Sequence, residues 1–84
     1  MTEGGATYLV VRLVRNGQTR IALRLPAMAV GDLVNLVSPD VRARCAIDED
    51  ELVRRGEAAV RDGYPVGDVL RAEHGDARLH ISLE

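Results

Sequence analysis

The sequence contains no lysine, tryptophan or phenylalanine, and its only aromatic side chains are Tyr8 and Tyr64. Proteins that bind single-stranded nucleic acid commonly stack bases on aromatic rings, and a P-loop requires a lysine. All 11 basic residues are arginines, and the 13 acidic residues outnumber them, which gives a net charge of -2. The composition therefore argues against general attraction to nucleic acid and against a P-loop nucleotide enzyme.

A single cysteine, Cys45, has no second cysteine with which to close a disulfide or build a thiolate metal site. We expect it to be a small, partly buried apolar residue, although Arg42 and Arg44 would favour its reactive thiolate. The sequence also lacks a run of about eighteen apolar residues and a basic segment followed by an apolar one at its start. A cytoplasmic protein without a transmembrane segment is therefore predicted.

The chain of 84 residues is long enough for one small domain. Its 46% hydrophobic and 29% charged residues are typical of a globular protein. Residues 1–7 include adjacent glycines and no apolar pattern, so we predict a flexible leader there. Residues 8–84 are predicted to form a single α+β domain.

The first part of this domain has the pattern of a β-hairpin. Two segments rich in β-branched and apolar residues, 8–15 and 18–25, flank the dipeptide Asn16-Gly17. A two-residue loop would place arginines of the second strand on the apolar face of the first. We therefore predict a three-residue loop that includes Arg15, with Gly17 left-handed. The odd-numbered residues then form one apolar face, which consists of Leu9, Val11, Leu13, Ile21, Leu23 and Leu25.

An amphipathic helix is predicted directly after this hairpin. Pro26 suits the first turn of a helix, and the apolar residues after it recur at i, i+3, i+4 and i+7. These residues are Val30, Leu33, Val34 and Val37. Gly31 within this helix indicates a close approach of two backbones, and a break of the helix there is the alternative. Ser38-Pro39 is expected to end the helix. The following segment, Asp40 to Ala46, is predicted to be a loop, with a single helical turn as the alternative.

A second helix has clear signals at both of its ends. Asp48 and Glu51 have the spacing of a capping box, with aspartate as the capping residue, and Ile47 can pack on Leu52 as a hydrophobic staple. Gly63 suits the left-handed position that follows a helix, and the proline two residues later prevents continuation. The predicted apolar side of the helix consists of Leu52, Val53, Gly56, Ala59 and Val60.

A second hairpin is centred on Gly75-Asp76, where glycine favours a two-residue type II′ turn. In the register that this turn sets, Glu73 lies opposite Arg78 on the outer face. The inner face of this hairpin holds Leu70, Ala72, Leu79 and Ile81. The chain is thus predicted to be an α+β fold with the order β-hairpin, two helices, β-hairpin. We expect a four-stranded, mainly antiparallel sheet with the helices on one face.

The even-numbered face of the first hairpin is the candidate binding surface. It combines tyrosine, arginine and β-branched side chains, of which tyrosine and arginine are enriched at protein interfaces. The alternative is an ordinary solvent-exposed face, in which arginine stems cover the apolar residues. The hypothetical interface residues are Tyr8, Val10, Arg12, Arg20 and Arg24; Val14 and Ala22 share this face.

The sequence contains no recognised catalytic or metal-binding pattern. His74 and His80 have no serine, cysteine or aspartate at a known catalytic spacing. The acidic run 48–51 lacks the alternating oxygen ligands and central glycine of a calcium loop. We therefore predict a protein that is not an enzyme and that uses no metal and no cofactor.

Two stretches, "YLVVRLVRNGQTRIALRLP" and "IDEDELVRRGEAAVRDGYPVGDVLRAEHGDARLHISLE", resemble a small bacterial domain. This is the SHOCT-like module at the N-terminus of envelope-stress proteins of the LiaX and YvlB type. The resemblance covers about residues 8–84, and it rests on Leu25-Pro26, Ile47-Asp48, Gly63 and the turn at 73–76. It implies a protein-interaction or assembly module in bacterial stress response or regulation, and it carries over no catalytic residues.

Together these features predict a non-enzymatic bacterial module for protein interaction or self-assembly. Its partner would be a second copy of the chain or another protein, and nucleic acid is not expected. The last strand, which includes Leu83, is expected to be a sheet edge through which two copies pair. The alternative function is a small domain that binds an anionic ligand or nucleic acid through the arginines of the first hairpin. A β-grasp fold is a further possibility, but the Gly75-Asp76 hairpin argues against it.

Overall fold

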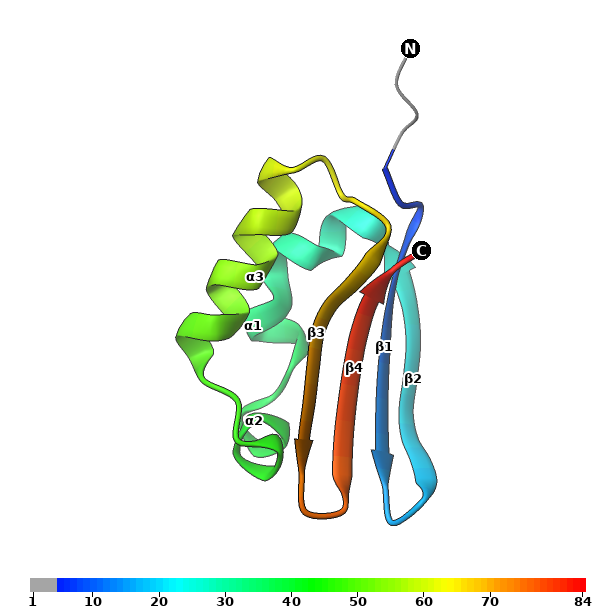
Figure 1. The fold of residues 1–84 in the computed structure, drawn as a ribbon, viewed down its shortest axis with the longest axis vertical. Coiled ribbons are helices and arrows are strands. Elements are labelled where there is room, and N and C mark those ends of the chain that lie inside the picture. Colours follow the sequence, from blue (N-terminus) through cyan, green and yellow to red (C-terminus); the bar gives the residue numbers. More distant parts are fainter. Residues whose placement is uncertain (1–4) are drawn as a thin grey trace.

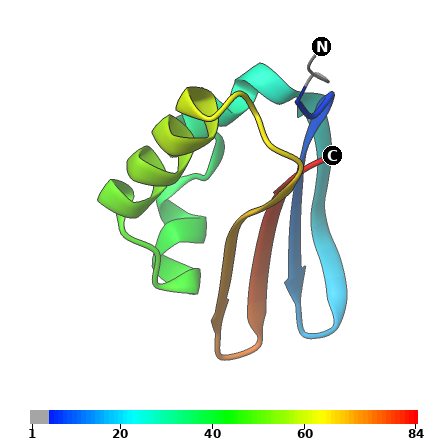
Figure 2. The same cartoon turned by 45° about the horizontal axis from the view of Figure 1, so that its top comes forward.

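The computed structural model describes residues 5–84 as a four-stranded antiparallel sheet with helices on one face (Figures 1 and 2). The predicted α+β class and the order of hairpin, helices and hairpin are confirmed. The strands are β1 (Tyr8–Arg15), β2 (Gln18–Pro26), β3 (Gly67–His74) and β4 (Ala77–Leu83), in the order β2-β1-β4-β3. The helical elements are the 3-10 helix η1 (Ala27–Asp32) and the α-helices α1 (Leu33–Leu36), α2 (Pro39–Cys45) and α3 (Glu49–Arg61).

The first hairpin has the predicted faces but a different loop. Leu9 pairs with Leu25, so the odd-numbered residues of both strands share the inner face of the sheet. Asn16 and Gly17 have φ angles of 53° and 75°, and two left-handed residues form a two-residue type I′ loop. The predicted three-residue loop is therefore wrong.

The one-residue shift that aligns these apolar faces comes from a bulge in β2. Val14 pairs with Thr19, but the next residue of β1, Leu13, pairs with Ile21. Arg20 is therefore the extra residue. This bulge shifts the pairing by one residue, which is the shift that we expected from a three-residue loop.

The second hairpin folds in the predicted register. Glu73 pairs with Arg78 across it, and Gly75 has a φ of 61°, as the first residue of a type II′ turn requires. However, β4 is a central strand, so the expectation that the last strand forms a sheet edge is wrong. Leu83 is 1% exposed and pairs with Leu9 of β1 on one side and with β3 on the other. The two edges of the sheet are β2 and β3.

The segment after the first hairpin forms two short helical elements rather than one, because the backbone of Asp32 (φ -124°, ψ 33°) departs from helical geometry between η1 and α1. Pro26 belongs to β2, and the helical residues begin at Ala27. The inner side of this segment is buried as predicted at Val30, Leu33 and Val37, whereas Val34 is only partly buried.

The predicted loop at 40–46 is wrong, because residues 39–45 form α2. The Ser38 side chain accepts a hydrogen bond from the backbone N–H of Val41 at 3.3 Å, and Pro39 occupies the first turn. We had interpreted Ser38-Pro39 as the end of a helix. The same dipeptide also suits a helix start, since serine caps the first turn and proline has no N–H that needs a partner there.

Helix α3 begins after Asp48, as predicted, but without the capping box. The Asp48 side chain makes no capping hydrogen bond, and Glu51 instead accepts hydrogen bonds from Arg55 at 2.9 Å and from Arg54 at 3.3 Å. Leu52 is buried, in agreement with the predicted apolar side of the helix. Two members of that side, Val53 and Val60, are exposed in the structure.

The end of α3 matches the prediction. Gly63 has a φ of 80°, and its N–H donates to the carbonyl of Val60 at 3.1 Å. The N–H of Tyr64 donates to the carbonyl of Ala59 at 2.8 Å. This pair of bonds is a Schellman motif, which satisfies the last carbonyls of the helix.

The beginning of the described chain lies against its end. The backbone N–H of Ala6 donates to the carbonyl of Tyr64 at 2.7 Å, and that of Thr7 donates to the carbonyl of Glu84 at 2.7 Å. Residues 1–4 of the predicted leader lie outside the described residues. Within residues 5–84, no helix is long and apolar enough to cross a membrane.

The core lies between the inner face of the sheet and the helices. Its fully buried large side chains are Leu9, Val30, Leu33, Leu52, Leu79, Ile81 and Leu83. Helix α3 packs closely on η1, where a Cβ atom added to Gly56 would lie 2.5 Å from the carbonyl oxygen of Val30. The close contact that we predicted at Gly31 is looser, since a Cβ atom there would meet Val60 Cγ2 at 3.4 Å.

We predict that Gly56→Ala destabilises the fold by about 1–3 kcal/mol, although alanine favours a helix more than glycine does, because the backbone of η1 must move away. Urea unfolding monitored by circular dichroism measures this change. Gly31→Ala is the matched control and is expected to have little effect. Equal stability of Gly56→Ala and the wild type would contradict the proposed close packing of α3 on η1.

Candidate functional site

The outer face of the sheet is the side away from the helices, and its residues are set by the strand register. Arg12 of β1 pairs with Ala22 of β2 and with His80 of β4, and His80 pairs with Arg71 of β3. We call the following residues the outer face: Tyr8, Val10, Arg12, Val14, Ala22, Arg24, Asp68, Arg71, Glu73, Arg78, His80 and Ser82. All four strands therefore contribute to one continuous surface.

Four of the five predicted interface residues lie together on this surface. Tyr8, Val10 and Arg12 alternate along β1, and Arg24 pairs with Val10. The guanidinium carbon of Arg24 lies 4.6 Å from the centroid of the Tyr8 ring, which is a cation–π contact. Arg20 is exposed but lies in the bulge of β2, near the loop and at the opposite end of the hairpin from Tyr8.

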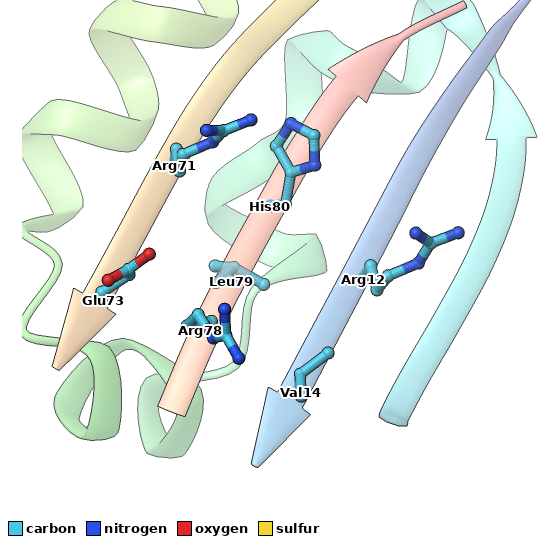
Figure 3. Close-up of a pocket in the computed structure, with 7 residues that line it drawn as sticks. All are labelled: Arg12, Val14, Arg71, Glu73, Arg78, Leu79 and His80. Carbon is cyan, nitrogen blue, oxygen red and sulfur yellow. The ribbon is translucent and has the colours of Figure 1, made fainter. Parts of the chain in front are cut away.

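The second hairpin supplies residues that were not among the predicted interface residues of the first hairpin. An open depression of about 370 Å³ lies over β1, β3 and β4 (Figure 3). It is lined by Arg12, Val14, Arg71, Glu73, Arg78, Leu79 and His80. In Figure 3, Arg71 extends from β3 toward His80, whereas Arg12 extends toward β2. The residues of β3 and β4 join the first hairpin only because β4 pairs with β1, and no local sequence signal encodes that pairing.

The carboxylate of Asp68 lies against the side chains of His80 and Arg71. It lies 2.7 Å from Nε2 of His80 and 3.3 Å from a guanidinium nitrogen of Arg71. The hydrogen bond with His80 lowers the pKa of Asp68, partial desolvation opposes this shift, and the charges of His80 and Arg71 lower the pKa further. The sequence pattern does not reveal this partner of His80, because Asp68 lies on the neighbouring strand.

The arginines fall into two groups by their ion pairs. Every arginine of the α-helices has a carboxylate within 4.0 Å, as has Arg71. Within residues 5–84, no such partner exists for the arginines of the first hairpin or for Arg78, although Glu73 is its cross-strand neighbour. These arginines are Arg12, Arg15, Arg20, Arg24 and Arg78. The helical layer, in contrast, carries Asp32, Asp40, Asp48, Glu49, Asp50, Glu51, Glu57 and Asp62.

The remaining candidate groups for chemistry are the thiol of Cys45 and the acidic and histidine side chains. Cys45 is buried in the core, and burial raises the pKa of its thiol, which opposes the reactive thiolate. Among residues 5–84, no group of three or more His, Cys, Asp or Glu side chains is arranged to hold a metal ion.

Comparison with known proteins gives no relative on which to base a function. No protein-family model matches the chain, and neither the curated proteins nor the solved structures contain a significant match. The function must therefore be inferred from the surface itself.

The Asp68 contacts predict how acid affects this surface. Because the pKa of Asp68 is lowered in the folded state, its contacts stabilise the fold at neutral pH, and this contribution is lost as the pH falls below about 4. We expect His80→Ala to raise the pKa of Asp68 more than Arg71→Ala does, since the hydrogen bond of His80 is the largest cause of the shift. A pH titration of the Asp68 carboxyl carbon by NMR measures both changes. A larger effect of Arg71→Ala would be inconsistent with this assignment.

Proposed function

We propose that the chain is a non-enzymatic protein-interaction module that binds an acidic protein surface on the outer face of its sheet. The observation that supports this proposal is the segregation of charge. The chain has a net charge of -2, yet within residues 5–84 the arginines that have no carboxylate within 4.0 Å lie on the first hairpin and β4. Positive potential of this kind steers an acidic partner to one face and fixes its orientation.

The composition of the outer face favours a protein as the partner. Tyr8, which is 42% exposed, and the partly buried Val10 and Val14 lie among the arginines and provide apolar contact area. Interfaces between proteins combine such apolar contacts with arginine, whereas protein surfaces that bind nucleic acid are more strongly positive overall. The acidic helices would also repel a long polyanion that extends beyond the sheet.

The resemblance to a SHOCT-like module is consistent with an interaction function and remains a prediction. It suggests a bacterial role in stress response or regulation. The chain's own residues support only the type of partner, an acidic protein surface.

A small anionic ligand is the second candidate, and the depression over β1, β3 and β4 favours it. Three arginines, Arg12, Arg71 and Arg78, line this depression together with His80. The guanidinium group of arginine can donate two parallel hydrogen bonds to a phosphate or carboxylate group. Glu73 in the same lining and Asp68 beside Arg71 and His80 reduce the positive charge there, which is why this candidate stands second.

A defined acidic polypeptide tests the proposed function. We expect poly-L-glutamate to bind the protein in isothermal titration calorimetry, and to bind more weakly as salt is added, because salt screens exposed charges. Arg12→Glu/Arg24→Glu should weaken this binding by about tenfold or more, since each arginine becomes a repulsive charge. Circular dichroism checks that these variants fold.

A charge reversal elsewhere provides the control. Arg54→Glu/Arg61→Glu makes the same change of charge on exposed positions of α3 and is expected to leave the affinity nearly unchanged. Equal losses in both double variants would show that only net charge matters, and the proposed surface would be rejected. Binding of inorganic pyrophosphate that is lost in Arg71→Ala/Arg78→Ala, without binding of poly-L-glutamate, would favour the second candidate.

A further inference from the structure

The two edges of the sheet differ in how far they are protected. An edge strand presents unpaired backbone groups to which another strand can bond, and proteins commonly block such edges with bulges, charges or a covering element. In Figures 1 and 2 the α-helices lie on the β3 side of the molecule, and β2 is the strand farthest from them, apart from its end, where η1 begins. The β2 edge is therefore the more open of the two.

The β3 edge carries several of these protective features. The register shifts between Asp68 and Leu70, so Val69 is the extra residue of a bulge. Arg55 of α3 donates a hydrogen bond to the carbonyl of Val69 at 3.5 Å. A second strand that approached β3 would meet this bulge, this arginine and the side of α3.

The β2 edge is regular over its last six residues. Beyond the bulge at Arg20, the pairing with β1 continues without a shift from Ile21 to Pro26. The N–H of Ala27 donates to the carbonyl of Thr7 at 3.1 Å, so the odd-numbered residues direct their backbone groups toward β1. The alternate residues, Ala22 and Arg24, therefore direct their N–H and C=O groups outward.

The inner face beside this edge is apolar and incompletely covered. Leu23 is 44% exposed, and Ile21 and Leu25 are only partly buried. A groove of about 150 Å³ separates β2 from α1 and α2, and it is lined by Val11, Ile21, Leu23, Leu36, Val37, Ser38, Val41 and Leu79. An open edge and an apolar strip thus occur on the same strand.

We propose that two copies of this chain pair antiparallel through β2, with the twofold axis at Leu23. In this register Ala22 of one copy forms the hydrogen-bonded pair with Arg24 of the second copy, and each pair exchanges two backbone bonds. On the inner face the two Leu23 side chains meet at the axis. An axis at Ala22 would place Arg20 opposite Arg24, and an axis at Arg24 would place two Arg24 side chains opposite each other. Opposed like charges destabilise both alternatives.

The β2 edge is complementary to itself, and this favours a second copy of the chain as its partner. The strand is basic on one face and apolar on the other. The axis at Leu23 matches apolar residues with apolar ones and places no arginine directly opposite another. The pairing would join two sheets into one of eight strands. It would leave the outer face of each copy open, so this proposal does not depend on the proposed function.

Cysteine crosslinking tests both the pairing and its register. Leu23→Cys places two thiols at the axis in a non-hydrogen-bonded pair, where the Cα atoms lie about 4.5 Å apart, within the range of a disulfide. We expect it to form a covalent dimer rapidly under mild oxidation. Ile21→Cys is the matched control, because its two copies would lie four residues apart along the strands, about 14 Å, and would not crosslink. The wild-type protein, which contains the buried Cys45, gives the background level of crosslinking.

Sedimentation equilibrium at protein concentrations up to about 1 mM measures the pairing without a crosslink. Ala22→Pro removes an outward N–H on an edge strand, a position where proline is tolerated in the fold, and should raise the dimer dissociation constant about tenfold or more. Ala22→Thr keeps the N–H and should pair like the wild type. Circular dichroism confirms that both variants fold.

Three results would overturn the proposal. These are a monomer at every concentration, equal crosslinking by Leu23→Cys and Ile21→Cys, and equal dimerisation of Ala22→Pro and Ala22→Thr. Salt separates this association from the binding of an acidic partner. Added salt should strengthen the pairing, because it screens the arginines of the two strands from one another, whereas it weakens binding on the outer face.

Discussion

The pairing of β1 with β4 is the interaction on which the rest of this structure depends. Each hairpin is held by local contacts, and an isolated hairpin is only marginally stable in water. The β1–β4 ladder places Leu9 beside Leu83 and Leu13 beside Leu79, so the inner faces of the two hairpins become one surface that the helices can cover. The same ladder places Arg12 beside His80 on the outer face. One backbone pairing thus creates both the core and the candidate binding surface.

The helical layer is the second constraint, because it covers only part of the sheet. The contact of Gly56 with the carbonyl of Val30 holds α3 against η1, and α3 in turn lies beside β3. The helices therefore cover the inner face of β2 only in part: Ile21 and Leu25 pack against the core, whereas Leu23 is exposed. Their acidic side chains neutralise the arginines of the helices themselves, so the uncompensated positive charge lies on the strands.

Features that a few adjacent residues determine were predictable from the sequence. The Gly75-Asp76 turn and the helix end at Gly63 follow from backbone conformations that glycine favours. The α2 helix was missed because Ser38-Pro39 suits both the end and the start of a helix, and only packing decides between them. Tyr8, Val10, Arg12 and Arg24 were grouped correctly by strand alternation, but Arg71, Arg78 and His80 were not, because sheet order depends on long-range pairing.

The outer face and the β2 edge would influence each other if both bind as proposed. Pairing at β2 would bring the outer-face arginines of two copies, including Arg12 and Arg24, onto one continuous sheet. Their mutual repulsion would weaken the dimer, and an acidic partner bound across the seam would relieve that repulsion. Because such coupling is reciprocal, the dimer would also bind the acidic partner more tightly than a single copy does. A basic sheet face next to a self-complementary edge therefore suits a module whose assembly responds to its partner.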